Sequence, residues 1–275
     1  MARVNDKPSC QSGWTMIGLF VLSTLVLSLL FSVVAHPWLT LPLWMVFRRC
    51  VSIAAAISVW WITTRLEHRA IRSYGFVSPP SGLRQFLFGI LLGVVSLGVL
   101  LALGLATGVC RVHAMSDHTK VWWILVGFLP ASVLVGILEE LVFRGFLLQH
   151  LARCSMGVAV VASSAAYSLV HLKTTAVGLL RAQELVGLFI LGTVLALSYL
   201  RTHQLYMAVG LHAVLAYGAR VNKLVLELPN QSLSWLVGTN RLINGVASWV
   251  VLLTVAAVIV RWTQPRAQGG ADGTT

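Results

Sequence analysis

The sequence predicts an all-α fold, a polytopic membrane helix bundle in which about eight transmembrane helices enclose a polar cavity. Hydrophobic residues make up 57% of the chain and charged residues only 10%, whereas a soluble domain carries about 25% charged residues. The apolar residues also recur in long runs, most of them near the ~20 residues that cross a bilayer. A soluble core of this size would not hide that much apolar surface, so we expect an integral membrane protein.

Eight apolar runs are candidate spans. They cover residues 14–35, 41–63, 86–109, 121–138, 158–171, 185–200, 205–219 and 245–260. The first is predicted to be a retained helix, because its apolar stretch exceeds the roughly 7–15 residues of a signal-peptide core. Arg48 and Arg49 restrict the start of the second. The fifth and the seventh are short and interrupted by polar residues, which indicates helices that line an internal cavity and do not face lipid.

These spans divide the chain into five predicted segments. Residues 1–13 form an N-terminal polar segment, and residues 14–120 hold about three N-terminal membrane helices. Residues 121–220 form the core that carries the candidate site described below. Residues 221–262 add a connecting loop and the last membrane helix. Residues 263–275 are rich in Gly, Ala and polar residues, so we predict a disordered tail.

The net charge of +12 does not indicate a nucleic-acid partner, because the Lys and Arg residues are scattered between the apolar runs. They are expected to flank the spans and to face anionic lipid headgroups. The cluster from Arg65 to Arg84 favours a cytoplasmic location for both termini. The four Cys residues lie far apart without a CxxC pair, so we predict buried thiols and no disulfide framework or Cys-based metal site.

Two adjacent carboxylates, Glu139 and Glu140, end the fourth apolar run, in a chain with only eight acidic residues. An acidic residue at the centre of a membrane helix costs roughly 2.5–3.5 kcal/mol on insertion scales, and such a residue indicates a functional site by default. On a helix, Glu140 and Arg144 share one face, so we expect them to form a bracing pair. Glu139 points about 100° away. We therefore expect it to face the cavity and to act on water or substrate.

Two later runs add histidines to this set. Tyr167 and His171 share a helix face, and His212 lies near the middle of the seventh run. A buried carboxylate beside a neutral imidazole can hold and deprotonate water, which is general-base catalysis, and a second histidine can stabilise a developing oxyanion. The alternative for either histidine is a structural hydrogen bond to a neighbouring helix. The full set predicts a peptide hydrolase without a serine or cysteine nucleophile.

The segment Glu139-Glu140-x-x-x-Arg144 resembles the first motif of the CAAX prenyl protease and bacteriocin-processing (CPBP, or Abi) family of intramembrane glutamate-dependent proteases. Tyr167-x-x-x-His171 is similar to the second motif of that family, an aromatic residue followed four positions later by His. Gly210-Leu211-His212 falls where the third motif, His-x-x-x-Asn, is expected. The order and the spacing of the motifs fit over roughly residues 121–220, which we take as a CPBP-like catalytic core.

The resemblance implies an intramembrane endopeptidase that cuts a membrane-associated or C-terminally processed protein. Glu139 would activate the water, His171 would assist it and His212 would contribute to the oxyanion site. Glu140 and Arg144 would orient and brace the helix. No cofactor is favoured, although Glu139, His171 and His212 match a His₂Glu set for a catalytic zinc ion. The compact chain favours the bacterial inner (plasma) membrane, with a protein or peptide substrate and the lipid bilayer as partners.

One position departs from the family pattern. The Asn of the third motif is replaced by Ala216, so the amide that would share the oxyanion is missing, and Tyr206 or Asn244 is an alternative donor. This departure supports a second hypothesis, a non-catalytic CPBP-like immunity or scaffold membrane protein. A third hypothesis, a proton-coupled transporter, fits the buried Glu and His residues, but no internal repeat of the kind common in transporters is visible.

Overall fold

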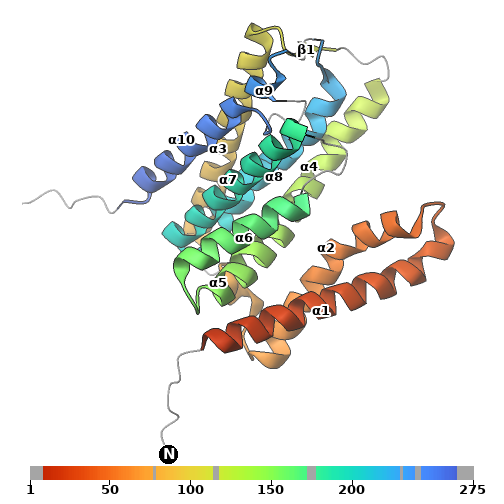
Figure 1. Ribbon diagram of the computed structural model, residues 1–275, viewed down its shortest axis with the longest axis vertical. Helices are drawn as coiled ribbons and strands as arrows, with labels where there is room; N and C mark the ends of the chain where they lie inside the picture. The colour runs from red at the N-terminus through yellow and green to blue at the C-terminus, as the bar shows by residue number, and fades with distance from the viewer. Residues whose placement is uncertain are drawn as a thin grey trace, which may run out of the picture.

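The computed structural model describes residues 9–76, 79–113, 118–171, 178–229, 232–238 and 243–264, and these residues form a bundle of helices (Figure 1). The first part of the chain contains α1 (Cys10–Ala35), the short helix η1 (His36–Trp38), α2 (Leu43–Trp61), the π-helical η2 (Ile62–Leu66), the 3₁₀ helix η3 (Ile71–Tyr74) and α3 (Pro79–Ala106). The central part contains α4 (His118–Glu140), the π-helical η4 (Leu141–Leu147), α5 (Leu148–Leu151), α6 (Met156–His171) and α7 (Gly178–Thr202). The last part contains α8 (Tyr206–Val225), the single-turn α9 (Ser234–Val237) and α10 (Val246–Trp262).

Each of the eight predicted spans is a helix in this structure. Five helical segments are long and apolar enough to cross a membrane, by length and composition: Cys10–Trp38, Leu43–Leu66, Pro80–Ala106, Val121–Leu151 and Gly178–Thr202. Two shorter apolar helices, Met156–His171 and Val246–Trp262, accompany them. The chain is therefore an integral membrane protein with an all-α bundle. The only β-strands among the described residues are β1 (Arg111–Val112) and β2 (Leu226–Glu227), which form a two-residue antiparallel pairing.

The helices α7 and α8 form the centre of the bundle. Helix α8 packs between α3 and α4, and α7 packs against α6 and α10. The contact between α4 and α8 is close because Gly136 has no side chain, and a Cβ there would lie 3.2 Å from the carbonyl oxygen of Val209. This close contact places the end of α4 against the middle of α8.

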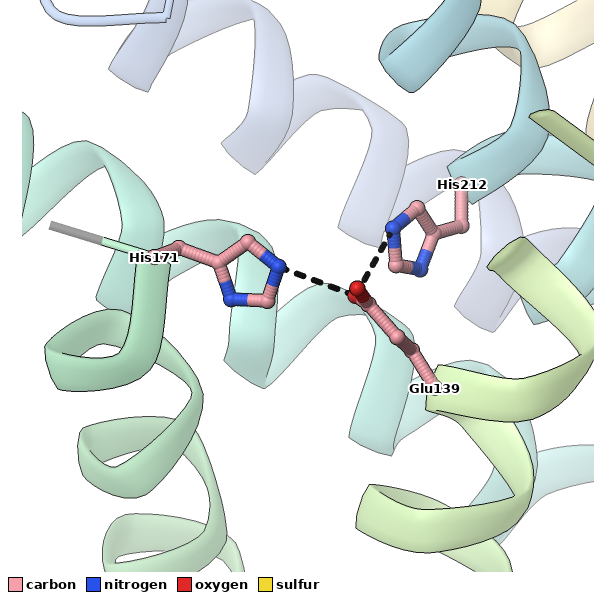
Figure 2. A group of neighbouring side chains, drawn as sticks. All are labelled: Glu139, His171 and His212. Carbon is pink, nitrogen blue, oxygen red and sulfur yellow. Dashed lines mark ion pairs between the residues drawn. The ribbon is translucent and has the colours of Figure 1, made fainter. Parts of the chain in front are cut away.

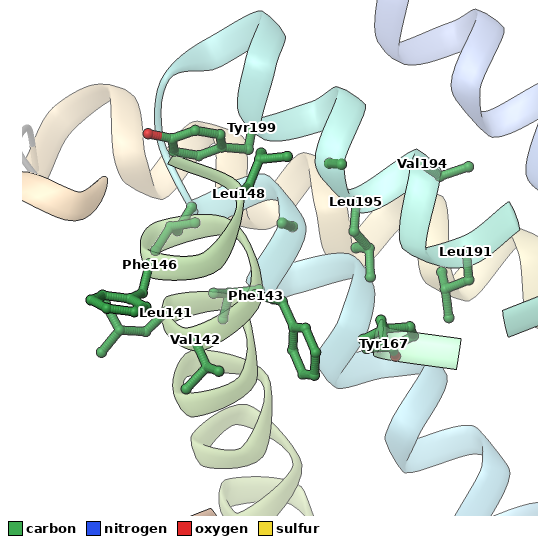
Figure 3. Packing of buried hydrophobic residues seen from close by; sticks show 14 of the residues in the cluster. Leu141, Val142, Phe143, Phe146, Leu148, Tyr167, Leu191, Val194, Leu195 and Tyr199 are labelled. Carbon is green, nitrogen blue, oxygen red and sulfur yellow. The ribbon is translucent and has the colours of Figure 1, made fainter. Parts of the chain in front are cut away.

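Apolar side chains from η4, α5, α6 and α7 form the core beside the candidate site (Figure 3). Phe146 and Leu195 are fully buried, and Tyr167 and Leu191 are nearly so. Helix η4 directly follows Glu140, and its π-helical geometry is a feature that recurs at functional sites. The core therefore holds the end of α4 rigidly against its neighbours.

The hairpin of α1 and α2 slants away from the other helices and is joined to them mainly at one end (Figure 1). At that end a disulfide links Cys10 of α1 to Cys154, which follows α5. The prediction of four buried thiols was wrong for these two residues. The two residues are 144 positions apart in the sequence, and they meet because α1 packs on α5. Sequence spacing alone does not predict this pairing. Cys110 is a buried thiol, and Cys50 is partly buried.

A second group of polar side chains lies at the same end, and we call Glu67, Tyr74, His150 and Arg153 the hairpin cluster. The Oε1 atom of Glu67 accepts from Arg153 Nη2 at 2.6 Å and lies 3.0 Å from His150 Nε2. Its Oε2 atom accepts from the hydroxyl of Tyr74. Burial alone raises the pKa of Glu67, but the hydrogen bonds from His150, Tyr74 and Arg153 outweigh it and lower the pKa to about 2. The carboxylate of Glu67 is therefore ionised, and both of its oxygens accept hydrogen bonds. The cluster links the hairpin to the rest of the bundle.

The two ends of the chain differ in how far the structure describes them. The segment 1–13 was expected to precede the first helix, but α1 begins at Cys10. Most of the tail predicted for residues 263–275 lies outside the described residues.

Candidate active site

Three helices bring Glu139, His171 and His212 to one point (Figure 2). Glu139 lies in the last turn of α4, His171 is the last residue of α6 and His212 lies in the first half of α8. The Oε2 atom of Glu139 is 2.9 Å from His171 Nε2 and 3.4 Å from His212 Nε2. The structure therefore places together the three residues that the sequence singled out separately.

The two histidines are held in fixed orientations by their other ring nitrogens. His171 Nδ1 lies 2.9 Å from the carbonyl oxygen of Tyr167, which can only accept a hydrogen bond. His212 Nδ1 lies 2.7 Å from Oε1 of Glu140, a carboxylate that also pairs with Arg144. Both Nδ1 atoms are therefore donors, and both Nε2 atoms point toward Glu139.

This arrangement creates an electrostatic requirement at the centre of the site. If both imidazoles are neutral, their Nε2 atoms present lone pairs to the Oε2 atom of Glu139. That oxygen is buried, and neither approach has hydrogen-bond geometry. Three converging lone pairs repel one another, so the site has to be completed by a positive species or by water. It is built to hold something between Glu139 and the two histidines.

Glu140 and Arg144 form the support of the site, as the helix spacing predicted. Arg144 Nη1 donates to Glu140 Oε1 at 2.8 Å, and both side chains are almost completely buried. Arg144 Nη2 also donates to the carbonyl oxygen of Gly192 on α7 at 3.0 Å. Gly192 packs tightly on α6, because a Cβ there would lie 3.0 Å from the Cα atom of Ser164. One arginine thus ties the end of α4 to α7, and Glu140 continues the network to His212 on α8.

An aromatic side chain completes the support. The ring of Tyr167 stacks on His171 with ring centroids 4.2 Å apart and meets His212 edge-on at 5.8 Å. The guanidinium of Arg144 lies over the ring of Tyr167, 4.7 Å from the ring centre. Such cation–π and stacking contacts fix ring orientations at little cost. Tyr167 therefore positions the histidines and lies where the second motif predicted an aromatic residue.

A cavity of about 260 Å³ opens from the site into the bundle. Its polar end is formed by Glu139, His171 and His212. Its remaining wall is mostly apolar and comes from α3, α4, α6, α7, α8, α10 and the segment just before α10. Besides the three residues named, the wall is formed by Ser96, Leu97, Leu100, Val135, Tyr167, Leu188, Leu191, Leu215, Ala216, Ala219, Ile243, Ser248, Val251 and Leu252. A polar reactive group at one end of an apolar cavity is the usual form of a substrate site.

The donor set also fits a divalent metal ion. One ligand atom each from Glu139, His171 and His212 lies within 4.8 Å of the others. Four-coordinate zinc with ligand distances of about 2.0–2.1 Å separates neighbouring ligands by about 3.3 Å, close to the separations found between Glu139 and the histidines. The hydrogen bonds of both Nδ1 atoms are also those that metal-binding histidines make. A bound zinc ion would supply Lewis acidity and an acidic water.

Two features of the site were not predicted from the sequence, and two suggested donors lie elsewhere. The bond between Glu140 and His212 depends on how α4 packs against α8, and sequence spacing carries no signal for it. The π-helical turn after Glu140 occurs in residues that fit an α-helix equally well. The proposed alternative donor Tyr206 packs against Phe76 with ring centroids 5.5 Å apart, and neither it nor Asn244 is among the described residues that line the cavity.

Comparison with known proteins agrees with these observations. The family model of the type II CAAX prenyl endopeptidases, Rce1-like, matches residues 121–217. The match begins at the start of the fourth predicted span and ends one residue after Ala216, so it contains all three motifs. No curated protein matches the chain. Residues 121–217, which hold the three-helix site, are therefore similar to the type II CAAX prenyl endopeptidases, Rce1-like.

Proposed function

We propose that this protein is an intramembrane endopeptidase that hydrolyses a peptide bond with a water molecule activated by Glu139 and His171. The observation that carries the proposal is the convergence of Glu139 Oε2 with two fixed Nε2 atoms at the polar end of an apolar cavity. The family match supports the reaction class. Glu139 is the residue with an oxygen that faces both the histidines and the cavity, so it is assigned as the base.

The charges of the site suggest different catalytic roles for His171 and His212. The site holds two carboxylates, Glu139 and Glu140, and one arginine, Arg144, which pairs with Glu140. If His212 carries one additional proton, the two negative charges are matched by two positive charges. His212 then has an Nε2–H that can donate a hydrogen bond, while its Nδ1–H continues to donate to Glu140. His171 keeps its Nε2 lone pair, because its Nδ1–H is committed to the carbonyl oxygen of Tyr167. His171 therefore accepts from the water, and His212 donates to the substrate carbonyl.

The reaction then follows from these roles. The water oxygen attacks the scissile carbonyl carbon, one water proton passes to Glu139 and the carbonyl oxygen becomes an oxyanion that His212 stabilises. Collapse of the tetrahedral intermediate breaks the C–N bond, and Glu139 returns the proton to the leaving amine. Glu140, Arg144 and Tyr167 hold the histidines in place, and of these three only Tyr167 lines the cavity. The apolar walls exclude other water and favour an apolar segment of a membrane-associated or C-terminally processed protein.

The test is to identify new protein termini in membranes of the source organism. Membranes from a deletion strain are complemented with the wild-type protein or with Glu139→Gln, and peptide termini are compared by mass spectrometry. We expect termini that appear with the wild type and are missing with Glu139→Gln at equal protein levels. Identical termini in both would remove the assignment and leave the non-catalytic immunity or scaffold role, which the loss of the motif Asn at Ala216 favours.

The metal question is decided separately. Purified protein is analysed for bound metal, and cleavage is measured before and after treatment with a chelator. Under the proton-balanced scheme, cleavage is insensitive to chelation. Stoichiometric metal, with loss of cleavage on chelation and recovery on adding zinc, assigns Glu139, His171 and His212 as its ligands. The cellular location that we propose, the bacterial inner membrane, is tested by fractionation of the same cells.

A further inference from the structure

The wall of the cavity beyond His212 lacks the amide that the family motif places there. Ala216 lies one helical turn after His212 on α8, and both residues line the cavity. An alanine offers no hydrogen bond to an oxyanion. If the protein is a protease, as proposed above, His212 needs a second donor from another helix at the level of Ala216.

Helix α3 is the element that packs along this part of α8. A Cβ on Gly93 would lie 2.7 Å from the Cβ atom of Val214, and one on Gly218 would meet the side chain of Leu97. The two helices therefore run side by side in the same direction, with the turn 93–97 facing the turn 214–218. Ser96 belongs to the first turn and Ala216 to the second.

Ser96 is positioned to face the cavity at this level. It lines the cavity together with Ala216, and it is only 3% exposed. Its hydroxyl donates to the carbonyl oxygen of Leu92 at 2.6 Å. Since Ser96 lies within α3, that carbonyl also accepts the helical hydrogen bond of the Ser96 N–H. The hydroxyl hydrogen can therefore rotate toward the cavity without leaving the carbonyl oxygen unsatisfied.

The other serine on the cavity wall is engaged differently. Ser248 Oγ lies 2.7 Å from the carbonyl oxygen of Ile243 and 2.6 Å from that of Gly245. Its single hydrogen is thus shared by two carbonyl oxygens that hold the first turn of α10. If that hydrogen turned toward the cavity, the first turn of α10 would lose these hydrogen bonds. The hydroxyl of Ser96 stabilises no such turn.

We propose that the Ser96 hydroxyl donates a hydrogen bond to the oxyanion of the tetrahedral intermediate and replaces the missing amide of the third motif. This inference rests on the proposed proteolytic function. As water adds to the carbonyl carbon, the negative charge on the oxygen attracts the Ser96 hydrogen away from the Leu92 carbonyl. No covalent bond to Ser96 forms. His212 and Ser96 then act from two different helices on the same oxygen.

The experiment compares cleavage of a substrate identified above by the wild type, Ser96→Ala, Ala216→Asn and the double variant. Loss of one oxyanion donor lowers kcat by about 10²-fold in other hydrolases, so we expect a drop of that order for Ser96→Ala with KM changed less than threefold. Ala216→Asn restores the family amide and should recover most of that loss in the double variant. A purely structural role of Ser96 would not be rescued by a change on another helix.

The control is Ser198→Ala, which removes a fully buried serine hydroxyl that donates to Leu195 at 2.8 Å and does not line the cavity. It should leave kcat within threefold of wild type. Equal kcat for wild type and Ser96→Ala, or a double variant that stays as slow as Ser96→Ala, overturns the proposal while Glu139→Gln still abolishes cleavage. A wild type without any cleavage removes the proposed function and this inference together. Thermal unfolding of each variant shows whether a slow variant is folded.

Discussion

The protein contains two buried clusters built from glutamate, histidine and arginine, one at the end of α4 and the other at α5, further along the same helical segment. In the hairpin cluster, both oxygens of Glu67 accept hydrogen bonds, and its side chain is 8% exposed. In the candidate active site, Glu139 is 20% exposed, faces the cavity and has a buried Oε2 atom without a hydrogen bond among the described residues. The two clusters thus contain similar residue types, but they differ in whether the carboxylate oxygens of their glutamates accept hydrogen bonds.

The difference separates a structural cluster from a reactive one. Glu67 is held as an anion with its lone pairs occupied, so it has no capacity to take a proton from water near neutral pH. Glu139 keeps an oxygen whose neighbours, His171 and His212, are oriented by bonds to other groups. A buried carboxylate is therefore a weak sign of catalysis until its hydrogen bonds are known. The following predictions test whether the two clusters differ in this way.

The largest expected effect on stability comes from Arg144→Met. Among the described residues, it leaves the buried carboxylate of Glu140 with His212 as its remaining hydrogen-bonding partner, and breaking a buried pair in this way costs about 3–5 kcal/mol. Thermal unfolding in detergent should show a large loss, and cleavage should be lost as well. A double variant with Glu140→Leu removes the orphaned charge and should recover part of the stability but no cleavage. Recovery of full cleavage would show that the network of Arg144 does not position His212.

Glu67→Gln should affect stability and its pH dependence. The folded-state pKa of Glu67 is lowered to about 2 from the ordinary value of 4.5, so the anion stabilises the fold above about pH 5, and this contribution is lost as the pH falls toward 2. The difference corresponds to about 3 kcal/mol. Unfolding of the wild type and of Glu67→Gln is compared from pH 7 to pH 3. The wild type should lose part of its advantage between pH 5 and pH 3, and two parallel pH curves would contradict the assigned hydrogen bonds.

Cys10→Ser tests the covalent part of the same end. Removing a disulfide typically costs about 2–4 kcal/mol, and we expect the lower value because the hairpin cluster still ties Glu67, just after α2 and η2, to His150 and Arg153. The wild type should unfold at a lower temperature after treatment with a reductant, and Cys10→Ser should be insensitive to it. Cys110→Ser, at a buried thiol outside the disulfide, is the control for reductant sensitivity. Cleavage should be unchanged by Cys10→Ser.

Gly192→Ala is expected to have the smallest effect on stability and a specific effect on activity. Its new Cβ would lie 3.0 Å from the Cα atom of Ser164, and such overpacking costs about 1–3 kcal/mol. The shift of α7 would draw the Gly192 carbonyl away from Arg144. Gly98→Ala is the matched control, because no atom lies within 4 Å of its Cβ position. Equal cleavage by both variants would show that the bond from Arg144 to Gly192 is dispensable.

The sequence allowed most of the fold to be predicted, because hydrophobicity and helical spacing are local properties. The eight helices, the pairing of Glu140 with Arg144 and the choice of Glu139, His171 and His212 all follow from runs and intervals along the chain. The bond from Glu140 to His212, the disulfide from Cys10 to Cys154 and the hairpin cluster could not be predicted. Each joins residues more than 70 positions apart, and only the packing of the helices brings them together.

The comparison of the two clusters is tested most directly by measuring both cleavage and unfolding for Glu139→Gln and Glu67→Gln side by side. General-base catalysis contributes about 10²–10⁴-fold, so Glu139→Gln should lower kcat by that factor and leave the unfolding temperature at or above that of the wild type. Glu67→Gln should do the opposite, with a lower unfolding temperature and kcat within threefold of the wild type at a temperature where it is folded. Cleavage by Glu139→Gln at the wild-type rate would contradict the account.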